Sequence, residues 1–365
     1  MGSGIKDTGY YSKVKGKLAK GCQLCVHGKK LVLFITGICA QRCYYCPISE
    51  KKFGKDVVHA NEWQVKNPNK PKELIEEAKL TEAKGAGITG GDPLANVARC
   101  VKYIRLLKKK FGRKFHIHLY TALKLVNKER LEKIYRAGLD EIRFHPDLDN
   151  DALWPRLELA LKYNWDVGVE IPAVPGKEKQ IKKLVDYIKD KDKVKFLNLN
   201  ELELSDTKVP HYNLDGFKPK NKITYGVKGS WETAKRIMEY AKNTKLNIHF
   251  CTAKLKDKIQ VGNRIKRRQK NVAKVYDVKT KEGTLVRGCI YAESLQKLRK
   301  IKSLLQKELK VPAKLLDIDA KKKRITTAVT VVSELKDWLK KEGVTPAIVE
   351  EYPTHDALKV DVIYL

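Results

Sequence analysis

Acidic residues are scarce in this chain relative to basic ones. Of its 365 residues, 76 are Lys or Arg and 43 are Asp or Glu, which gives a formal net charge of +33. Thermophilic proteins raise Glu together with Lys to build ion-pair networks, so that cause does not explain the imbalance. A positive charge of this size attracts polyanions, of which RNA and DNA are the common ones. A generally basic proteome or a solvated lysine coat is the alternative explanation.

Long apolar runs are absent as well. The sequence has no stretch of about 18 uncharged apolar residues, the length that a membrane-spanning helix requires. Residues 1–6 lack the apolar segment of a signal peptide, and no amphipathic segment favours a membrane surface. We therefore expect a cytoplasmic protein without a membrane partner. A hydrophobic content of 42% in 365 residues is enough for one large α/β domain and a smaller one.

Because a secretion signal is missing, the eight cysteines favour metal or redox chemistry over disulfides. Cys39, Cys43 and Cys46 lie within eight residues, just after the apolar run Leu31–Ile35. Thiolates are the usual ligands of iron–sulfur clusters, and a short loop after a strand can bring three of them to one cluster. This stretch lacks a fourth ligand, so one iron would stay open to a small chelating molecule unless a distant cysteine fills it. The alternatives are a zinc knuckle, which normally needs four protein ligands, or three unrelated buried cysteines.

This cysteine spacing, with Tyr45 before the third cysteine, resembles the CxxxCxφC signature of the radical S-adenosylmethionine (radical SAM) superfamily. The resemblance implies a [4Fe–4S] cluster whose open iron is chelated by SAM. It also implies an electron donor such as ferredoxin or flavodoxin, reductive cleavage of SAM, and a 5′-deoxyadenosyl radical that abstracts hydrogen from a substrate. Over roughly residues 20 to 290, the chain looks like an archaeal-type branch described as similar to pyruvate formate-lyase-activating enzyme. The residues that carry this resemblance are Gly21-Cys22, Cys25, Gly37, Cys39, Cys43, Cys46, Gly90-Gly91-Asp92-Pro93 and His249-Phe250-Cys251.

From residue 31 onward, short apolar runs alternate with helical patterns. The alternation predicts parallel strands joined by right-handed crossovers. About seven such units predict a full or partial (β/α) barrel with its chemistry at the carboxyl ends of the strands; an open doubly wound sheet is the alternative. The predicted strands are Leu31–Thr36, Gly87–Thr89, His116–Thr121, Glu141–His145, Val167–Pro172, Val194–Glu203 and Leu246–Cys251. The predicted helices are Pro71–Ala83, Asn96–Lys110, Asn127–Ala137, Asp151–Tyr163, Glu178–Lys189 and Ser230–Lys242.

We divide the chain into four regions. Residues 1–30 are a basic N-terminal extension with a CxxC pair, 31–253 are the barrel, 254–279 are a basic linker, and 280–365 are a small α+β domain that we consider as an RNA-binding module. In that domain we predict helices at 292–308 and 333–342, apolar alternation at 325–332, and strands at 347–351 and 358–364.

Paired glycines follow the second predicted strand. Such glycines let the backbone approach a ligand closely. Gly90-Gly91-Asp92-Pro93 resembles the family's GGEP motif, which contacts the methionine amino group of SAM, with Asp92 in place of Glu. The resemblance implies further SAM contacts at later strand ends, where Arg143 is a candidate partner of the SAM carboxylate. The alternative for each such residue is a strand-end side chain that faces solvent or satisfies a loop. The predicted SAM-binding residues are Tyr45, Gly90, Gly91, Asp92, Arg143, Glu170 and Asn198.

Three more cysteines suggest a second metal centre. Cys22 and Cys25 form a CxxC pair just before the first barrel strand, and Cys251 ends the last one. We expect them to bind a second iron–sulfur cluster or, as second choice, zinc, with Cys289 or a non-protein group as fourth ligand. Independent buried cysteines are the alternative, and Cys100 is expected to be packed core.

The basic linker is the candidate nucleic-acid site. It holds ten Lys or Arg against two acids, and on a helix Arg264, Arg267 and Arg268 would share a face able to bind phosphate. A solvated basic helix is the alternative. We therefore predict a radical SAM enzyme that modifies an RNA, with tRNA as the expected partner. The alternative is an enzyme that modifies or activates a protein or peptide, in the manner of a glycyl-radical activase, and a third class is a non-catalytic metal protein that binds RNA.

Overall fold

The computed structural model describes residues 4–222 and 224–365 and divides the chain into two compact units, Met1–Val261 and Gly262–Leu365. The boundary differs from the predicted one. The region predicted as a linker, 254–279, is largely helical: a π-helix, η3, covers Leu255–Val261, and α7 covers Gly262–Val272. Because α7 belongs to the second unit, that unit begins earlier than residue 280.

In its described residues, the first unit is built on an 11-stranded sheet in the order β1-β2-β11-β10-β9-β8-β7-β6-β3-β4-β5. The strands from β3 to β11 in the middle of this order pair in parallel, as the βα alternation predicted. Their outer neighbours are antiparallel, β4 on β3 and β2 on β11, so the sheet is a partial barrel. The parallel strands are β3 (Lys30–Phe34), β6 (Gly85–Thr89), β7 (His116–Ala122), β8 (Glu141–His145), β9 (Asp166–Ala173), β10 (Val194–Glu201) and β11 (Asn247–Cys251); the antiparallel ones are β1 (Lys6–Asp7), β2 (Lys13–Lys15), β4 (His59–Ala60) and β5 (Trp63–Gln64).

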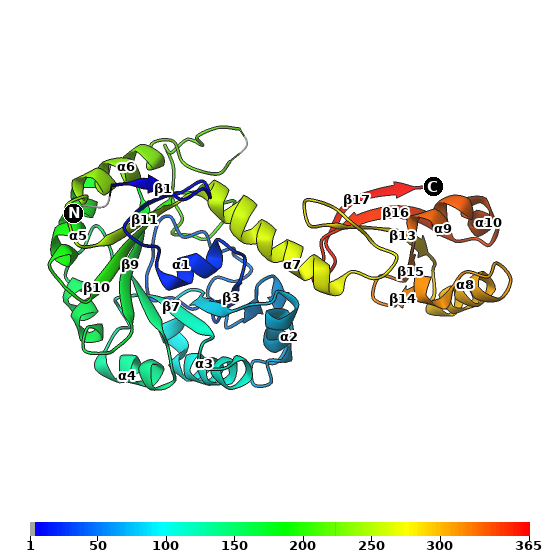
Figure 1. Ribbon diagram of the computed structural model, residues 1–365, viewed down its shortest axis with the longest axis horizontal. Helices are drawn as coiled ribbons and strands as arrows, with labels where there is room; N and C mark the ends of the chain where they lie inside the picture. Colours follow the sequence, from blue (N-terminus) through cyan, green and yellow to red (C-terminus); the bar gives the residue numbers. More distant parts are fainter. Residues whose placement is uncertain (1–3, 223) are drawn as a thin grey trace. The chain divides into compact units, whose positions relative to one another are not determined.

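Helices cover the outer face of this sheet (Figure 1). Two of them begin at a side-chain cap: the side chain of Asn96 accepts from the Arg99 amide at 3.1 Å, and that of Asn127 accepts from the Arg130 amide at 2.9 Å. The predicted helix 151–163 is instead a 3₁₀ segment, η2 (Trp154–Ala160), with Pro155 in its first turn. The α-helices are α2 (Lys72–Leu80), α3 (Val97–Phe111), α4 (Lys128–Arg136), α5 (Glu178–Lys189) and α6 (Ser230–Tyr240).

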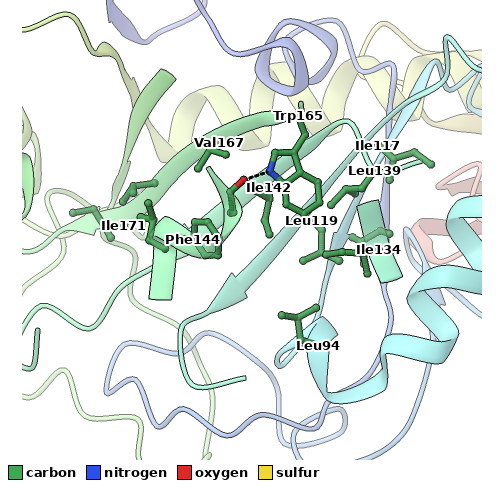
Figure 2. Close-up of a cluster of buried hydrophobic side chains, with 14 of the residues drawn as sticks. Leu94, Ile117, Leu119, Ile134, Leu139, Ile142, Phe144, Trp165, Val167 and Ile171 are labelled. Carbon is green, nitrogen blue, oxygen red and sulfur yellow. Dashed lines mark hydrogen bonds between the residues drawn. The ribbon is translucent and has the colours of Figure 1, made fainter. Parts of the chain in front are cut away.

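The main apolar core lies between the sheet and these helices (Figure 2). Alternate residues of β7, β8 and β9 supply it, including Leu119, Phe144 and Val167, which are all buried. Trp165 packs at its edge and donates its indole N–H to the carbonyl of Ala160 at 2.9 Å. Successive side chains of a strand point to opposite faces, so the residues between these apolar ones line the inner face of the sheet.

The N-terminal segment is part of the barrel rather than a separate extension. Strand β2 pairs with β11, and the helix α1 (Lys20–Cys25) lies on the inner face (Figure 1). Gly21 allows this close approach, because a Cβ atom there would come within 2.4 Å of the side chains of His118 and Arg143. Its amide donates to Glu141 Oε2 at 3.1 Å. The prediction of an extension failed because β2 and α1 are short, with only three and six residues.

The second unit is an antiparallel sheet in the order β14-β15-β13-β16-β17, with β12 on β13, and it packs α8, α9 and α10 against one face. The central strand β13 was not predicted, since Arg287 and Gly288 interrupt its apolar pattern. The bounds are β12 (Val278–Lys279), β13 (Leu285–Tyr291), α8 (Leu295–Lys307), β14 (Asp317–Asp319), β15 (Arg324–Thr327), α9 (Val329–Glu334), α10 (Lys336–Lys341), β16 (Thr345–Glu351) and β17 (Lys359–Tyr364). Across the described ranges of both units, no helix has the length and apolar character needed to traverse a bilayer.

Candidate metal and cofactor site

The loop that follows β3 carries the three predicted cluster cysteines. Cys39, Cys43 and Cys46 are half-buried free thiols. Burial first, and then the negative charges of Cys46 and Cys39, raise the pKa of Cys43 to about 12, so the three sulfurs lie within electrostatic reach of one another. In the described residues, no group of three or more Cys, His, Asp or Glu side chains is placed so that it could hold a metal ion. Three neighbouring thiols on one loop nevertheless fit a cluster that keeps one iron open, because iron would replace their protons.

The glycine pair after β6 packs against the start of this loop. Gly90 has a φ of +146°, and a Cβ atom on Gly91 would lie 2.4 Å from the carbonyl oxygen of Ile38. The amide of Gly91 donates to the carbonyl of Thr36, and the amide of Asp92 donates to that of Ile38, both at 2.8 Å. The close backbone approach predicted for the glycines is therefore toward the cysteine loop, which they hold in place.

Asp92 lies beneath this contact and is buried. Its Oδ1 accepts from the hydroxyl of Thr121 at 2.8 Å and from the Leu94 amide at 3.0 Å. Its Oδ2 is buried and has no hydrogen-bond partner among the described residues. Burial raises the pKa of Asp92 to about 6 despite these two donors. An ammonium group would supply the missing donor to Oδ2, so Asp92 fits the role that the GGEP-like motif implies.

Tyr45 connects the cysteine loop to the strand ends. Its hydroxyl lies 2.9 Å from Nε2 of His145, and Nδ1 of His145 lies 2.8 Å from the carbonyl oxygen of Glu170. The sequence placed His145 at a strand end but did not select it. Arg143, two residues earlier on the same face of β8, was selected instead as a SAM-binding residue.

Arg143 lies inside an ion-pair network on the inner face. Its Nε donates to Glu141 Oε1 at 2.6 Å, and its Nη1 donates to Glu170 Oε2 at 2.7 Å and to the Tyr120 hydroxyl at 3.1 Å. The guanidinium is buried, so its charge is already compensated by protein groups. This arrangement does not favour the predicted pairing with the SAM carboxylate. The Glu170 contact comes from the tertiary fold, whereas Glu141 lies two residues before Arg143 on the same face of β8, a spacing that is visible in the sequence.

Glu170 and Asn198 belong to the same network. The amide groups of Asn198 and Asn200 donate to the Glu170 carboxylate at 2.9 and 3.0 Å. Burial raises the pKa of Glu170, but Arg143 and these amides outweigh burial and hold the pKa below its usual value. The carboxylate is thus ionised and fixed in orientation. The Oδ1 atom of Asn198 is buried and lacks a partner within the described chain, so it remains available to a ligand hydroxyl.

The cysteines of the predicted second centre lie on the inner face. Asn198 Nδ2 donates to Cys22 Sγ at 3.3 Å, and the charges of Cys22 and Cys25 contribute to the pKa of Cys251, which burial raises first. Cys289, the suggested fourth ligand, is buried in β13 of the second unit, where Arg324 Nη1 donates to its sulfur at 3.3 Å. Cys289 is therefore a core residue of its own unit.

The predicted phosphate-binding arginines are not an exposed stripe. Arg264 and Arg268 are buried on α7, and Arg267 is half-buried. The arginines do share a face of α7, as predicted. That face is not open to solvent, since Arg264, Arg268 and the neighbouring Ile265 are buried. This packing gives no support to α7 as a nucleic-acid surface.

A family model of the radical SAM superfamily matches residues 33–191, and a model of a domain of unknown function matches residues 283–365. The chain belongs to the radical SAM superfamily. A Methanocaldococcus jannaschii protein provisionally named glycyl-radical enzyme activating enzyme is 42% identical over 363 residues, which cover 96% of this chain and 93% of that protein. This relative also agrees with the predicted resemblance to pyruvate formate-lyase-activating enzyme.

Shorter and more distant similarities also occur. The anaerobic ribonucleoside-triphosphate reductase-activating protein of Enterobacteria phage T4 is 26% identical over 149 residues, 38% of this chain and 90% of that protein. Among solved structures, methylornithine synthase aligns with a TM-score of 0.38 and 14% identity, over 57% of this chain and 62% of that chain. Coproporphyrinogen III oxidase from Escherichia coli aligns with a TM-score of 0.37 and 9% identity, over 61% and 56%. This chain thus spans less than two thirds of either structure.

Membership in this family implies a [4Fe–4S] cluster and SAM as cofactors, as predicted. Bound together, they supply a 5′-deoxyadenosyl radical that abstracts hydrogen. The chain contributes thiols from Cys39, Cys43 and Cys46 for the cluster. Close to them, Gly90 and Gly91 fix the loop, and Asp92 offers an acceptor for an ammonium group.

Proposed function

We propose that this protein activates a glycyl-radical enzyme, so that its substrate is a glycine residue of a partner protein. The observation that carries the proposal is the 42% identity to the Methanocaldococcus jannaschii protein, which extends over nearly all of both chains. The alignment includes the second unit as well as the barrel. This reading corresponds to the alternative that the sequence left open rather than to the RNA-modifying enzyme that it favoured.

A loop beside the cysteines supports a polypeptide substrate. The hydroxyl of Thr207 donates to the carbonyl of Ile48 at 2.7 Å, and the amide of Asn213 donates to the carbonyl of Tyr44 at 2.7 Å. Apolar residues of the same loop, including Leu214, pack with Tyr44 and Tyr45. This loop, within residues 203–222 and 224–229, therefore borders the cysteine loop. Long loops at such positions commonly bind substrates.

The proposal includes an electron donor, whereas RNA modification has less support. Radical SAM enzymes need an electron donor, and we propose a ferredoxin or flavodoxin. RNA modification retains one supporting observation, the net charge of +33. The burial of Arg264 and Arg268 removes the specific phosphate-binding face on which that prediction relied.

The experiment is anaerobic incubation of the cluster-loaded enzyme with SAM, dithionite and a glycyl-radical enzyme from the same organism. We expect an electron paramagnetic resonance signal of a glycyl radical on the partner, together with 5′-deoxyadenosine. The Cys43→Ala variant is the control and should give neither. Nucleoside mass spectrometry of tRNA from cells that lack the protein tests the alternative. A missing modified nucleoside, with no protein radical, would contradict the proposal.

A further inference from the structure

Tyr45 occupies the turn that joins two of the predicted cluster cysteines. The amide of Cys46 donates to the carbonyl of Cys43 at 3.0 Å, which closes a β-turn with Tyr44 and Tyr45 as its central residues. The directions of the two flanking thiols therefore depend on how this turn is held. A contact that fixes Tyr45 also fixes the end of the cysteine loop.

The side chain of Tyr45 reaches strand β8 through a hydrogen bond whose direction follows from its neighbours. Nδ1 of His145 lies 2.8 Å from the carbonyl oxygen of Glu170, which can only accept, so Nδ1 carries a proton. Burial lowers the pKa of His145 below its usual value, so at neutral pH the ring is neutral and Nε2 has a free lone pair. The hydroxyl of Tyr45, 2.9 Å from Nε2, therefore donates to it.

This hydrogen bond connects the cysteine loop to two strands of the parallel sheet. His145 is the last residue of β8, and its other ring nitrogen contacts the main chain of β9. The two rings also pack edge to face, with the centroids of Tyr45 and His145 5.8 Å apart and an interplanar angle of 67°. The imidazole thus joins Tyr45 to the most regular part of the barrel.

Other parts of the cysteine loop have different anchors. The glycine pair holds the loop before its first cysteine, and Gln41 Nε2 donates to Asp147 Oδ2 at 2.9 Å between the first and second cysteines. At the turn itself, the amide of Asn213 donates to the carbonyl of Tyr44 at 2.7 Å. Asn213 lies in an irregular loop, however, whereas His145 lies in a strand. The contact with His145 is therefore the one that ties the turn to the sheet.

We propose that His145 is a positioning residue for the iron–sulfur cluster. It acts through Tyr45: the hydrogen bond between them holds the turn, and the turn holds the thiols of Cys43 and Cys46 toward the cluster. Groups that orient metal ligands from outside the ligand shell typically change metal affinity by about 10- to 100-fold. His145 therefore slows the loss of the cluster without being one of its ligands.

The first test measures how fast the reconstituted protein loses its cluster to an iron chelator under anaerobic conditions, followed by the decay of the cluster's visible absorbance. His145→Phe and Tyr45→Phe should each accelerate the loss by about tenfold, the lower end of that range. Because both variants remove the same hydrogen bond, the double variant should be no faster than the faster single one. Unchanged rates in both single variants, or multiplied rates in the double variant, would overturn the proposal.

Tyr103→Phe is the matched control for Tyr45→Phe. It also removes one tyrosine hydrogen bond, which joins the hydroxyl of Tyr103 on α3 to the Pro68 carbonyl at 2.8 Å. Both variants should lower the Tm of the cluster-free protein by similar amounts, and only Tyr45→Phe should accelerate cluster loss. Equal acceleration in the two variants would show a general effect on stability and would contradict a positioning role.

A second test separates the two contacts of the imidazole. In His145→Gln, the side-chain amide oxygen takes the place of Nε2 and can accept from Tyr45, whereas in His145→Asn the amide takes the place of Nδ1 and reaches only the Glu170 carbonyl. We expect His145→Gln to restore the slow rate of cluster loss and His145→Asn to stay as fast as His145→Phe. Restoration by His145→Asn alone would contradict the proposal. These measurements need no glycyl-radical enzyme, so their failure is distinguishable from a failure of the proposed activation.

Discussion

The two faces of the parallel sheet are built from alternate residues of the same strands, and they differ completely in chemistry. On the outer face, Ile142 and Phe144 of β8 pack into the apolar core. On the inner face, Glu141 and Arg143 of the same strand form buried ion pairs. Closed (β/α) barrels usually fill their interior with branched apolar side chains. The outer face of this sheet therefore stabilises the fold, and the inner face is kept for ligands.

The largest loss of activity is expected when a ligand of the cluster is removed. Cys43→Ala takes away one of three thiols, and an iron–sulfur cluster cannot be held at this loop by the remaining two. We expect 5′-deoxyadenosine formation to fall to background under anaerobic reducing conditions, measured by liquid chromatography. Cys100→Ala is the matched control, since Cys100 is a buried thiol of α3. Equal loss of activity in both variants would show that the effect is structural.

An outer-face substitution should instead act on stability. Phe144→Ala removes a fully buried ring from the core and should lower the free energy of unfolding by about 3–5 kcal/mol. Denaturant unfolding checks this value. SAM cleavage per folded molecule should be retained, because Phe144 points away from the inner face. If SAM cleavage falls by a larger factor than the folded fraction does, the claim that the two faces have separate roles is wrong.

Arg143→Met tests the ion pairs of the inner face. It leaves Glu141 and Glu170 as buried carboxylates without their cation, which should destabilise the protein by about 3–5 kcal/mol at pH 7. The network holds the pKa of Glu170 below its usual value, so its contribution to stability is present at neutral pH and is lost as pH falls through and below about 4.5. The wild type and the variant should therefore converge in stability on acidification. A constant difference between pH 7 and pH 4 would exclude this explanation.

Asp92 gives the smallest expected effect. The pKa of its buried carboxyl is about 6, and an ammonium ligand requires the ionised form. SAM affinity should therefore rise with pH up to about 6 and level off above it, with a change of at most about tenfold per pH unit below the pKa. Equilibrium binding to the cluster-loaded enzyme between pH 5 and 8 measures this dependence. Asp92→Asn should bind more weakly at pH 8 and lose the pH dependence, and an unchanged profile would exclude Asp92 as the acceptor.

Sequence predicted the framework of the first unit because its signals are local. The apolar runs that became β3, β7 and β9 stand between helical patterns, and the spacing of Cys39, Cys43 and Cys46 needs no tertiary information. The predictions that failed concern residues whose partners are distant in the sequence. Lys15 looked like part of a basic extension, but its ammonium donates to the carbonyls of Ala241 and Thr244, just after α6.

The predicted roles of polar residues show the same contrast between local signals and distant partners. Arg143 was chosen as a SAM-binding residue because its contacts with Tyr120 and Glu170, on the neighbouring strands, cannot be read from the sequence, although Glu141 lies two residues away on its own strand.

The most direct test of the account is the electron paramagnetic resonance spectrum of the reduced cluster with and without SAM. The account predicts that anaerobically reconstituted protein binds one [4Fe–4S] cluster at Cys39, Cys43 and Cys46, and that SAM changes its spectrum because one iron is open to chelation. A spectrum that SAM leaves unchanged would show that protein ligands fill all four iron sites, and it would contradict the account.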